Sequence, residues 1–170
     1  FVGIDTHALS EPALVTTVEV LAGNGVSVVL EEGLGATPTP VVSHAILSWN
    51  RGRTAGLADG IVITPSHNPP EDGGFKYNPP SAGRIQGRAN EILLQGLAGV
   101  KRLAWHQALA STYVSQRDLT GPYIEDLPNI LDMEAIRGAG LHLGVHPLGG
   151  AALDTWTRIG ERFSLNIEIV

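Results

Sequence analysis

Side chains that can do chemistry are concentrated in residues 64–80 of this 170-residue chain. A serine hydroxyl can accept a phosphoryl group, and a phosphoserine carries about −1.5 to −2 charges and three acceptor oxygens. Ser66 is therefore a candidate phosphoryl carrier, and His67, Asn68 and the loop amides are donors that could hold the added charge. Lys76 could neutralise a bound phosphate or, with a lowered pKa, move a proton. Two carboxylates complete the set, Glu71 and Asp72.

Two other interpretations of this stretch compete with a phosphoryl carrier. A serine and a histidine can act as nucleophile and base, but adjacent residues of an extended loop point to opposite sides. Ser66 also lacks the G-x-S-x-G context of a hydrolase, so we expect no hydrolase dyad with His67. Serine and asparagine favour turns for local hydrogen-bonding reasons, so a simple turn is the second alternative.

Metal-ligand patterns in the sequence are weak. Magnesium prefers oxygen ligands, and Glu71 and Asp72 are local candidates, but no D-x-D-x-D run accompanies them. The histidines other than His67 show no metal-ligand spacing, and we interpret them as structural or surface residues. They are His7, His44, His106, His142 and His146.

A stiff loop at the end of a buried strand is predicted to position these groups. Residues 60–63 form an apolar run, and five of the chain's 11 prolines follow it in residues 64–80. Proline fixes φ and removes an N–H donor, so this stretch cannot be a helix interior or a central strand. Loops at strand ends are where α/β proteins place functional side chains.

Apolar strands alternate with amphipathic helices before this loop. The strands are predicted over residues 1–4, 26–30 and 60–64. The first helix is predicted to begin with Ser10 as its N-cap and to end at residues 23–25, and the second follows Thr39 and Pro40. Because the strands are apolar throughout, both faces of the sheet should be covered. We therefore predict an α/β fold, with a mixed, mostly parallel sheet sandwiched by helices in the order β-α-β-α-β.

The rest of the chain predicts short helices and a second β-α-β unit. A short helix is predicted over residues 90–97, short helices or turns over 105–111 and 115–118, and an amphipathic helix over 122–131. Asp132 is the expected N-cap of another helix, which ends at Gly138. The second unit is a strand over residues 141–145, a helix over 153–163 and a strand over 165–170. We expect a first domain over residues 1–120, without its N-terminal part, and the truncated start of a second, similar α/β domain over 121–170.

Composition limits the classes of function. Apolar residues make up 43% of the chain and charged residues 16%, which fits a globular protein with a core. The net charge is −6 and no cluster of Lys or Arg stands out, which argues against binding to nucleic acids or anionic membranes. The chain has no cysteine, which excludes a disulfide framework. No apolar run approaches the roughly 20 residues of a membrane span.

Several segments resemble the α-D-phosphohexomutase superfamily. The sequence TPSHNPPEDGGFKYNPP at residues 64–80 resembles its phosphoserine loop, in particular that of the bacterial glucose-specific phosphoglucomutases. Four other segments resemble the same group: GIDTHALSEP at residues 3–12, TPTP at 37–40, LADG at 57–60 and PLGG at 147–150. The resemblance covers nearly the whole chain, and the Ser-His-Asn-Pro loop is a specific motif.

The resemblance implies an isomerase that interconverts glucose 1-phosphate and glucose 6-phosphate. Ser66 would be the catalytic phosphoserine, giving its phosphoryl group to a hexose phosphate substrate and taking back the other phosphate of a glucose 1,6-bisphosphate intermediate. His67 is implied as a catalytic residue, Asn68 as a substrate-binding residue, and Lys76 matches a lysine linked to general acid/base catalysis. Mg²⁺ is the implied cofactor, bound at Ser66 through a phosphate oxygen, and the implied location is cytoplasmic.

The same resemblance sets limits on the chain. Family members have four domains, so we expect a catalytic arginine before Phe1 and a three-aspartate metal loop after Val170. The 170 residues alone are therefore expected to be inactive. Sugar choice depends on the other domains, so a phosphomannomutase or a phosphoglucosamine mutase is one alternative. A non-catalytic α/β module that binds phosphate or a partner chain is another.

Overall fold

The computed structural model describes residues 1–69, 71–78 and 82–170. The strands are β1 (Val2–Ile4), β2 (Val28–Glu31), β3 (Gly60–Ile63), β4 (Phe75–Asn78), β5 (Val114–Arg117), β6 (His142–Val145) and β7 (Asn166–Ile169). The α-helices are α1 (Ser10–Gly23), α2 (Thr39–Asn50), α3 (Ala82–Leu94), α4 (Trp105–Ala110), α5 (Thr120–Asp126), α6 (Met133–Gly138) and α7 (Leu153–Phe163). Short 3-10 helices cover Glu32–Leu34 and Leu127–Asn129.

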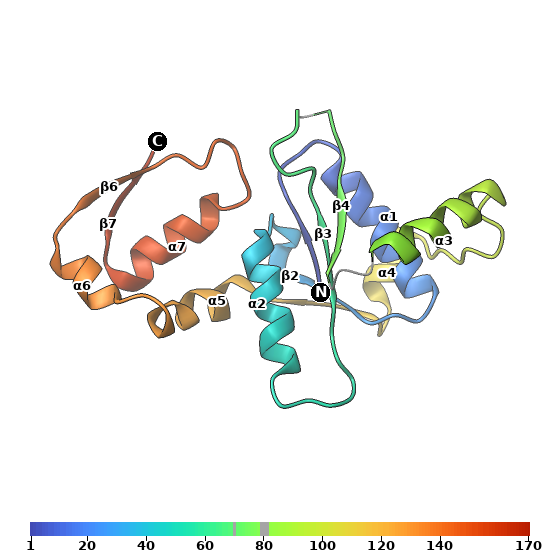
Figure 1. The fold of residues 1–170 in the computed structure, drawn as a ribbon, viewed down its shortest axis with the longest axis horizontal. Helices are drawn as coiled ribbons and strands as arrows, with labels where there is room; N and C mark the ends of the chain where they lie inside the picture. Colours follow the sequence, from blue (N-terminus) through green and yellow to red (C-terminus); the bar gives the residue numbers. More distant parts are fainter. Residues whose placement is uncertain (70, 79–81) are drawn as a thin grey trace.

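The central sheet has the order β1-β3-β4 and lies between α1 and α2 (Figure 1). β1 and β3 are parallel, and β4 is antiparallel to β3. Successive side chains of a strand point to opposite faces. Ile4 and Ile63 accordingly join the core cluster of α1, whereas Val62 packs with Val42 and Ile46 of α2. The predicted α/β fold, with parallel strands covered by helices on both faces, is confirmed.

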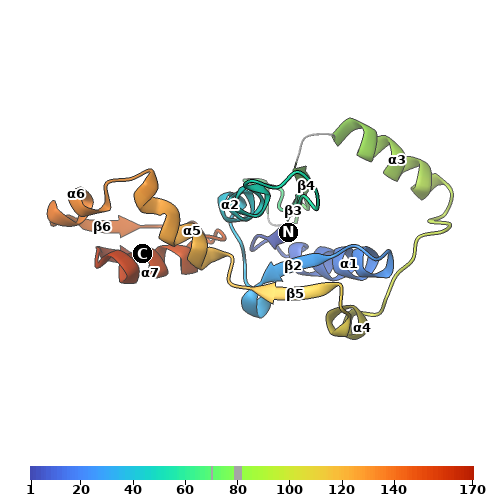
Figure 2. The same ribbon diagram turned by 90° about the horizontal axis from the view of Figure 1, so that it is seen from below.

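The pairing of β2 differs from the single sheet that the sequence predicts. β2 is hydrogen-bonded to β5 as a parallel pair, with Val28 opposite Val114, and the two strands lie side by side in Figure 2. The prediction of a helix or turn over residues 115–118 is wrong. β5 is an edge strand with mostly exposed polar residues, and its sequence therefore lacks the apolar run of a buried strand.

The start of α1 also differs from its prediction. Ser10 is the first helical residue, and the N-cap position, Leu9, makes no side-chain capping hydrogen bond. The buried hydroxyl of Ser10 instead donates to the carboxylate of Asp5. Ser10 therefore links the helix to the loop after β1, and the prediction of an N-cap is wrong.

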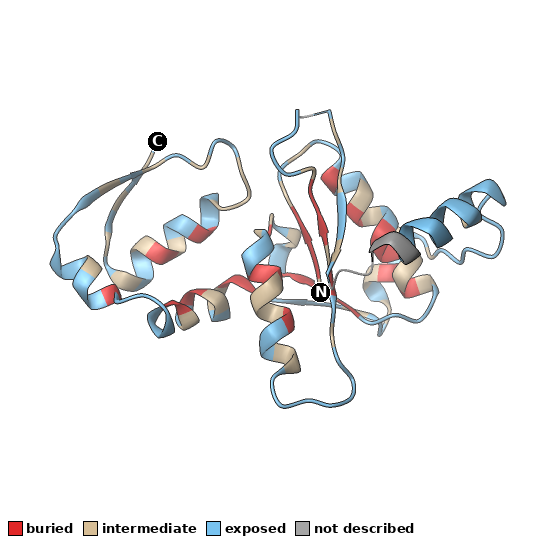
Figure 3. Cartoon of the chain, viewed as in Figure 1, coloured by how far each residue is buried: buried red, intermediate tan, exposed pale blue. Residues whose placement is uncertain are grey.

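The residues after β5 form a second unit. β6 and β7 are parallel and are connected by α7, whose bounds match the predicted helix. The backbone N–H of Ala135 donates to Asp132 Oδ1 at 2.9 Å, which confirms Asp132 as the N-cap of α6. Buried positions run along β1, β3, α1 and α2 and recur in α5 and α7 (Figure 3). Of the helices in the described ranges, none is long and apolar enough to cross a membrane.

Candidate active site

The chain between β3 and β4 forms the connection of a β-hairpin. The backbone N–H of Thr64 donates to the carbonyl oxygen of Gly74 at 2.9 Å and closes the hairpin. A Cβ atom on Gly74 would lie 2.1 Å from the carbonyl oxygen of Thr64, a distance that no side chain tolerates. The second glycine of the Gly73–Gly74 pair is therefore required by the close approach of the two backbones.

The predicted loop over residues 64–80 is shorter in the structure. Phe75–Asn78 form β4, with Lys76 opposite Val62 of β3, so the prediction of a loop is wrong for these residues. Their side chains are mostly exposed, which is typical of an edge strand rather than of a buried one. Pro70, Pro79 and Pro80, which belong to the predicted loop, lie outside the described residues.

Ser66 has a left-handed backbone conformation near the start of the hairpin connection. Its φ is +72°, which is uncommon for a residue other than glycine, and its backbone N–H donates to the hydroxyl of Thr64 at 2.9 Å. The expectation of an extended backbone at Ser66 is therefore wrong. Ser66 Oγ lies 3.5 Å from Nδ1 of His67, which is longer than an ordinary O–H···N hydrogen bond. Both side chains are exposed to solvent.

Asp5 organises the loop that follows β1. Its carboxylate accepts hydrogen bonds from the hydroxyl of Ser10, from the backbone N–H of His7 at 3.0 Å and from Nδ1 of His7 at 2.7 Å. Burial acts to raise the pKa of Asp5, but hydrogen bonds from Ser10, Thr64 and His7 outweigh it and lower the pKa. Asp5 is therefore held as a carboxylate between β1 and the hairpin.

His7 connects this carboxylate to the hairpin connection. Its Nδ1 contacts Asp5, and its Nε2 lies 3.1 Å from the backbone carbonyl oxygen of Asn68. Both neighbours are acceptors, which favours the imidazolium form with two N–H donors. The pKa of His7 is raised, chiefly by the Asn68 carbonyl and then by the charges of Asp5 and Asp72, although burial opposes the change. The half-buried imidazole thus lies against the segment that carries Ser66.

The interpretation of His7 as an ordinary structural or surface residue missed this contact. A signal was present, because His7 follows β1 and Ser66 follows β3. The carboxyl ends of parallel strands meet at the same edge of a sheet, so the two loops had to be neighbours.

Asn68 and Lys76 lie at different parts of the hairpin. The side-chain amide of Asn68 donates to Asp72 Oδ2 at 3.0 Å, and the backbone N–H of Asp72 donates to the carbonyl oxygen of Pro69 at 3.0 Å. The exposed Lys76 forms no ion pair or side-chain hydrogen bond with any described residue. The structure therefore brings Ser66, His67 and Asn68 together with His7, and leaves Lys76 on the neighbouring strand.

A family match covers the part of the chain that carries this site. Residues 1–101 match the family described as phosphoglucomutase/phosphomannomutase, alpha/beta/alpha domain I. The chain belongs to the phosphoglucomutase/phosphomannomutase family. The match contains the loop after β1, both helices that cover the sheet and the hairpin that carries Ser66.

Individual relatives are longer members of the same family. A phosphoglucomutase of Komagataeibacter xylinus is 49% identical over 178 aligned residues, which cover 100% of this chain and 32% of the relative. A phosphoglucomutase/phosphomannomutase of Thermococcus kodakarensis is 31% identical and is matched over 80% of this chain and 28% of its own length. A crystal structure assigned to a phosphomannomutase of Thermus thermophilus superposes with a TM-score of 0.66 at 29% identity, covering 99% of this chain and 35% of that one. The chain thus spans about a third of the length of these relatives.

The described carboxylates and histidines do not gather into a metal site. Within residues 1–69, 71–78 and 82–170, no group of three or more His, Asp or Glu side chains could hold a metal ion. Asp72 already accepts a hydrogen bond from Asn68, and the carboxylate of Asp5 is used by Ser10 and His7. This part of the chain therefore does not form a Mg²⁺ site by itself.

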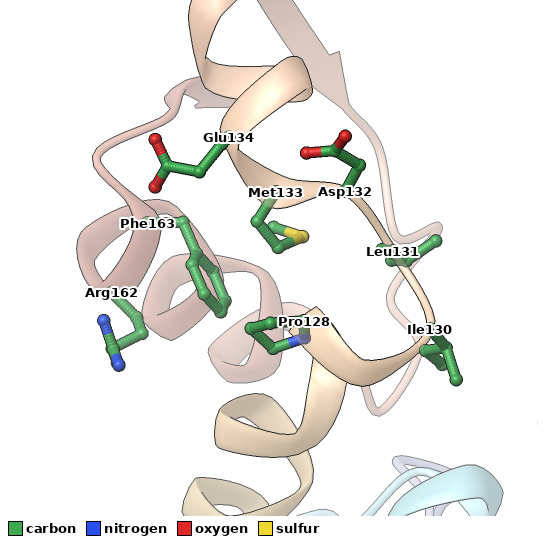
Figure 4. Close-up of a pocket in the computed structure, with 8 residues that line it drawn as sticks. All are labelled: Pro128, Ile130, Leu131, Asp132, Met133, Glu134, Arg162 and Phe163. Carbon is green, nitrogen blue, oxygen red and sulfur yellow. The ribbon is translucent and has the colours of Figure 1, made fainter.

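The second unit contains a hollow of about 570 Å³, which lies away from the hairpin that carries Ser66. It is lined by Pro128, Ile130, Leu131, Asp132, Met133, Glu134, Arg162 and Phe163 (Figure 4). Its cation, Arg162, is paired with Glu125 at 2.5 Å and 2.7 Å, and Asp132 caps α6. These polar groups are used within the fold, so the hollow offers no group to the chemistry of Ser66.

Proposed function

We propose that the longer protein containing these residues is a phosphoglucomutase, a phosphotransferase of the isomerase class, with Ser66 as its phosphoryl carrier. The observation that carries this proposal is the exposed Ser66 at the hairpin, whose left-handed backbone is hydrogen-bonded to Thr64 and whose segment contacts the imidazole of His7 through the carbonyl oxygen of Asn68. Membership of the family and the 49% identity to a phosphoglucomutase over the whole chain support it.

The proposed reaction moves a phosphoryl group twice. A hydroxyl oxygen of the bound hexose phosphate forms a bond to the phosphorus of phosphoserine 66, and the bond from phosphorus to Oγ breaks. The hydroxyl loses its proton to a base, for which we propose Lys76, and the departing Oγ gains a proton to become the serine hydroxyl. The product of this step is glucose 1,6-bisphosphate, which turns over in the site. The hydroxyl of Ser66 then attacks the other phosphate and gives up its proton, the bond from that phosphorus to the sugar oxygen breaks, and the sugar oxygen takes up a proton.

The residues around Ser66 have separate proposed tasks. A phosphoserine is dianionic or nearly so, and the His7 imidazolium supplies a positive charge close to the hairpin that carries it. His67 is proposed to contact the transferring group and Asn68 to bind substrate. Asp72 and Asn68 hold each other, so the turn that presents Ser66 is fixed before the substrate arrives.

The cofactor, the location and the domain arrangement of the longer protein extend this proposal. We propose that Mg²⁺ would be held at Ser66 through its phosphate, with its other ligands outside the described residues, and would neutralise part of the charge of the phosphoryl group. A relative from Mesembryanthemum crystallinum is named a cytoplasmic phosphoglucomutase, which supports a cytoplasmic location. We also propose a boundary between a first domain at residues 1–120 and a second at 121–170. These two regions have separate core clusters.

A second candidate function follows from the relatives. A phosphoglucosamine mutase of a Synechococcus strain is 34% identical over 62% of this chain. A coupled assay of the full-length protein on glucose 1-phosphate, mannose 1-phosphate and glucosamine 1-phosphate distinguishes these mutases. We expect the highest kcat/KM for glucose 1-phosphate, and a higher value for either other sugar would assign the protein to that activity instead.

The role of Ser66 is tested in the full-length protein. We expect Ser66→Ala to lower kcat by roughly a thousandfold or more, because the phosphoryl carrier is lost. Ser115→Ala, at an exposed serine of β5, is the matched control and should retain full activity. Intact-mass analysis should find one phosphate on the wild type and none on Ser66→Ala. An unphosphorylated, inactive wild type would favour a non-catalytic module.

A further inference from the structure

Three arginines that lack a carboxylate partner converge on one pocket of the first unit. Among the arginine side chains that the structure describes, most form ion pairs: Arg88, Arg102, Arg137, Arg158 and Arg162. The other three described ones, Arg51, Arg53 and Arg117, form none. All three line a pocket of about 370 Å³ between the end of α2 and the end of β5.

Trp49 holds two of these cations in place. Cζ of Arg53 lies 4.4 Å from the centroid of the indole ring, and Cζ of Arg117 lies 6.0 Å from it. The indole N–H donates to the carbonyl oxygen of Gly56 at 2.9 Å, and the ring of Phe1 meets the indole edge-on at 6.3 Å. Both guanidinium groups are therefore in cation–π range of an anchored ring, which reduces their freedom before any ligand binds.

The acidic groups near the pocket are already used. Asp118, which lines the pocket, accepts two hydrogen bonds from Arg158, each of 2.9 Å. Asp126 accepts from Asn129 at 2.6 Å and lies 3.0 Å from Nε2 of His44. The three arginines thus form a local excess of positive charge in a chain whose net charge is −6.

The pocket is separate from the Ser66 site. Its wall includes Phe1, which precedes β1, and Arg51 and Arg53, which follow α2. Ser66 follows the other end of β3, which is parallel to β1. Parallel strands all start at one end of the sheet and finish at the other. The pocket lies at the end where β1 starts and Ser66 at the end where β3 finishes, so the length of the strands separates the two sites.

We propose that this pocket binds a small polyanion through Arg51, Arg53 and Arg117. Guanidinium groups match the geometry of both phosphate and carboxylate oxygens, so the ligand is a small molecule with at least two such groups. The volume lies within the range of small-molecule sites, and the negative net charge of the chain disfavours a nucleic acid. The proposal does not depend on the mutase activity, because it uses no residue of the hairpin.

The test is a titration that reports on Trp49 alone. The full-length protein is labelled with 5-fluorotryptophan, and the fluorine resonance of Trp49 is assigned through Trp49→Phe. Pyrophosphate and citrate are titrated as the phosphate and carboxylate probes, with sodium chloride at equal ionic strength as the control. Arg51→Gln and Arg117→Gln distinguish binding at the pocket from binding at Ser66, because neither residue belongs to the hairpin. The result is therefore independent of whether Ser66 carries phosphate.

We expect a saturable shift with at least one of the two probes, and the probe that binds more tightly identifies the chemical class. Arg117→Gln and Arg51→Gln should each weaken binding at least about tenfold, whereas Arg137→Gln on α6 should leave it unchanged. The proposal is overturned if sodium chloride at the same ionic strength shifts the Trp49 resonance as much as the probes do. It is also overturned if neither probe saturates, or if the two pocket variants bind as tightly as wild type.

Discussion

Nε2 of His7 lies 3.1 Å from the carbonyl oxygen of Asn68, although the two residues are 61 positions apart. This contact joins the loop after β1 to the hairpin connection that carries Ser66. The other ring nitrogen contacts Asp5 at 2.7 Å, so the imidazole spans the two loops. The position of the Ser66 segment is consequently sensitive to the protonation of His7.

The pKa of His7 should lie above its ordinary value of 6.5, because the Asn68 carbonyl and the carboxylates of Asp5 and Asp72 favour the cation. Protonated His7 therefore stabilises the folded state. This contribution is complete below pH 6.5 and is lost as the pH rises through the pKa of His7 in the folded state. The pKa of Asp5 is lowered from 3.8, so its contribution is present above 3.8 and is lost as the pH falls through its folded-state value.

The measurement is a pH titration of the His7 ring by NMR. Asp5→Asn should move the pKa of His7 downward, since it removes a negative charge that favours the imidazolium, whereas Asp132→Asn on the second unit should not. Hydrogen exchange of the backbone amides in the hairpin connection, corrected for its intrinsic pH dependence, should become faster in the wild type as the pH rises past the pKa of His7. A His7 pKa at or below 6.5 would contradict the proposed contact.

Thr64→Val should disturb Ser66 without removing it. The substitution deletes the hydroxyl that accepts the hydrogen bond from the Ser66 N–H, and the left-handed backbone at Ser66 loses its anchor. We expect a loss of about 1 kcal/mol in the free energy of unfolding and a decrease in kcat of about tenfold or more. Thr54→Val, at an exposed threonine, is the control. Unchanged kcat in a folded Thr64→Val protein would show that this hydrogen bond does not position Ser66.

Gly74→Ala should be far more damaging than Gly73→Ala. A Cβ on Gly74 would lie 2.1 Å from the Thr64 carbonyl oxygen, whereas a Cβ on Gly73 would have its closest contact, the end of the Leu9 side chain, at 3.5 Å. The hairpin backbone would have to separate in the first variant, at a cost of roughly 3 kcal/mol or more. Urea denaturation of both variants measures the difference. Equal stabilities of the two variants would mean that the hairpin closes without the close approach of the Gly74 and Thr64 backbones.

Arg102→Met should destabilise the first unit by leaving a buried carboxylate unpaired. The Glu19 side chain is 8% exposed, and its carboxylate is paired with Arg102, whose side chain is 55% exposed. Removal of the cation should cost about 1–3 kcal/mol, and the additional change Glu19→Gln should recover part of the loss. The matched control is Arg137→Met, because the Glu134 partner is 80% exposed and should tolerate the change within about 0.5 kcal/mol. Similar losses in both variants would contradict the role of burial.

Local sequence patterns were sufficient for the buried elements. The apolar run before Ser66 and the stripe that includes Val42 and Ile46 predicted a strand and a helix that pack together in the structure. The polar edge strands were different. β4 and β5 bury little side-chain surface, and their identity as strands comes from pairing with β3 and β2 rather than from apolar residues of their own.

The sequence by itself determined the α/β class, the second β-α-β unit and the position of Ser66 after a buried strand. Each follows from periodicity and from residues adjacent in the chain. Only the tertiary structure decided the left-handed backbone of Ser66, the contact of His7 with Asn68 and the convergence of three arginines near Trp49. The reason is physical: these relationships depend on which strand ends share an edge of the sheet and on how closely two backbones approach. Neither the neighbourhood of strand ends nor the approach of two backbones can be read from the spacing of residues along one segment.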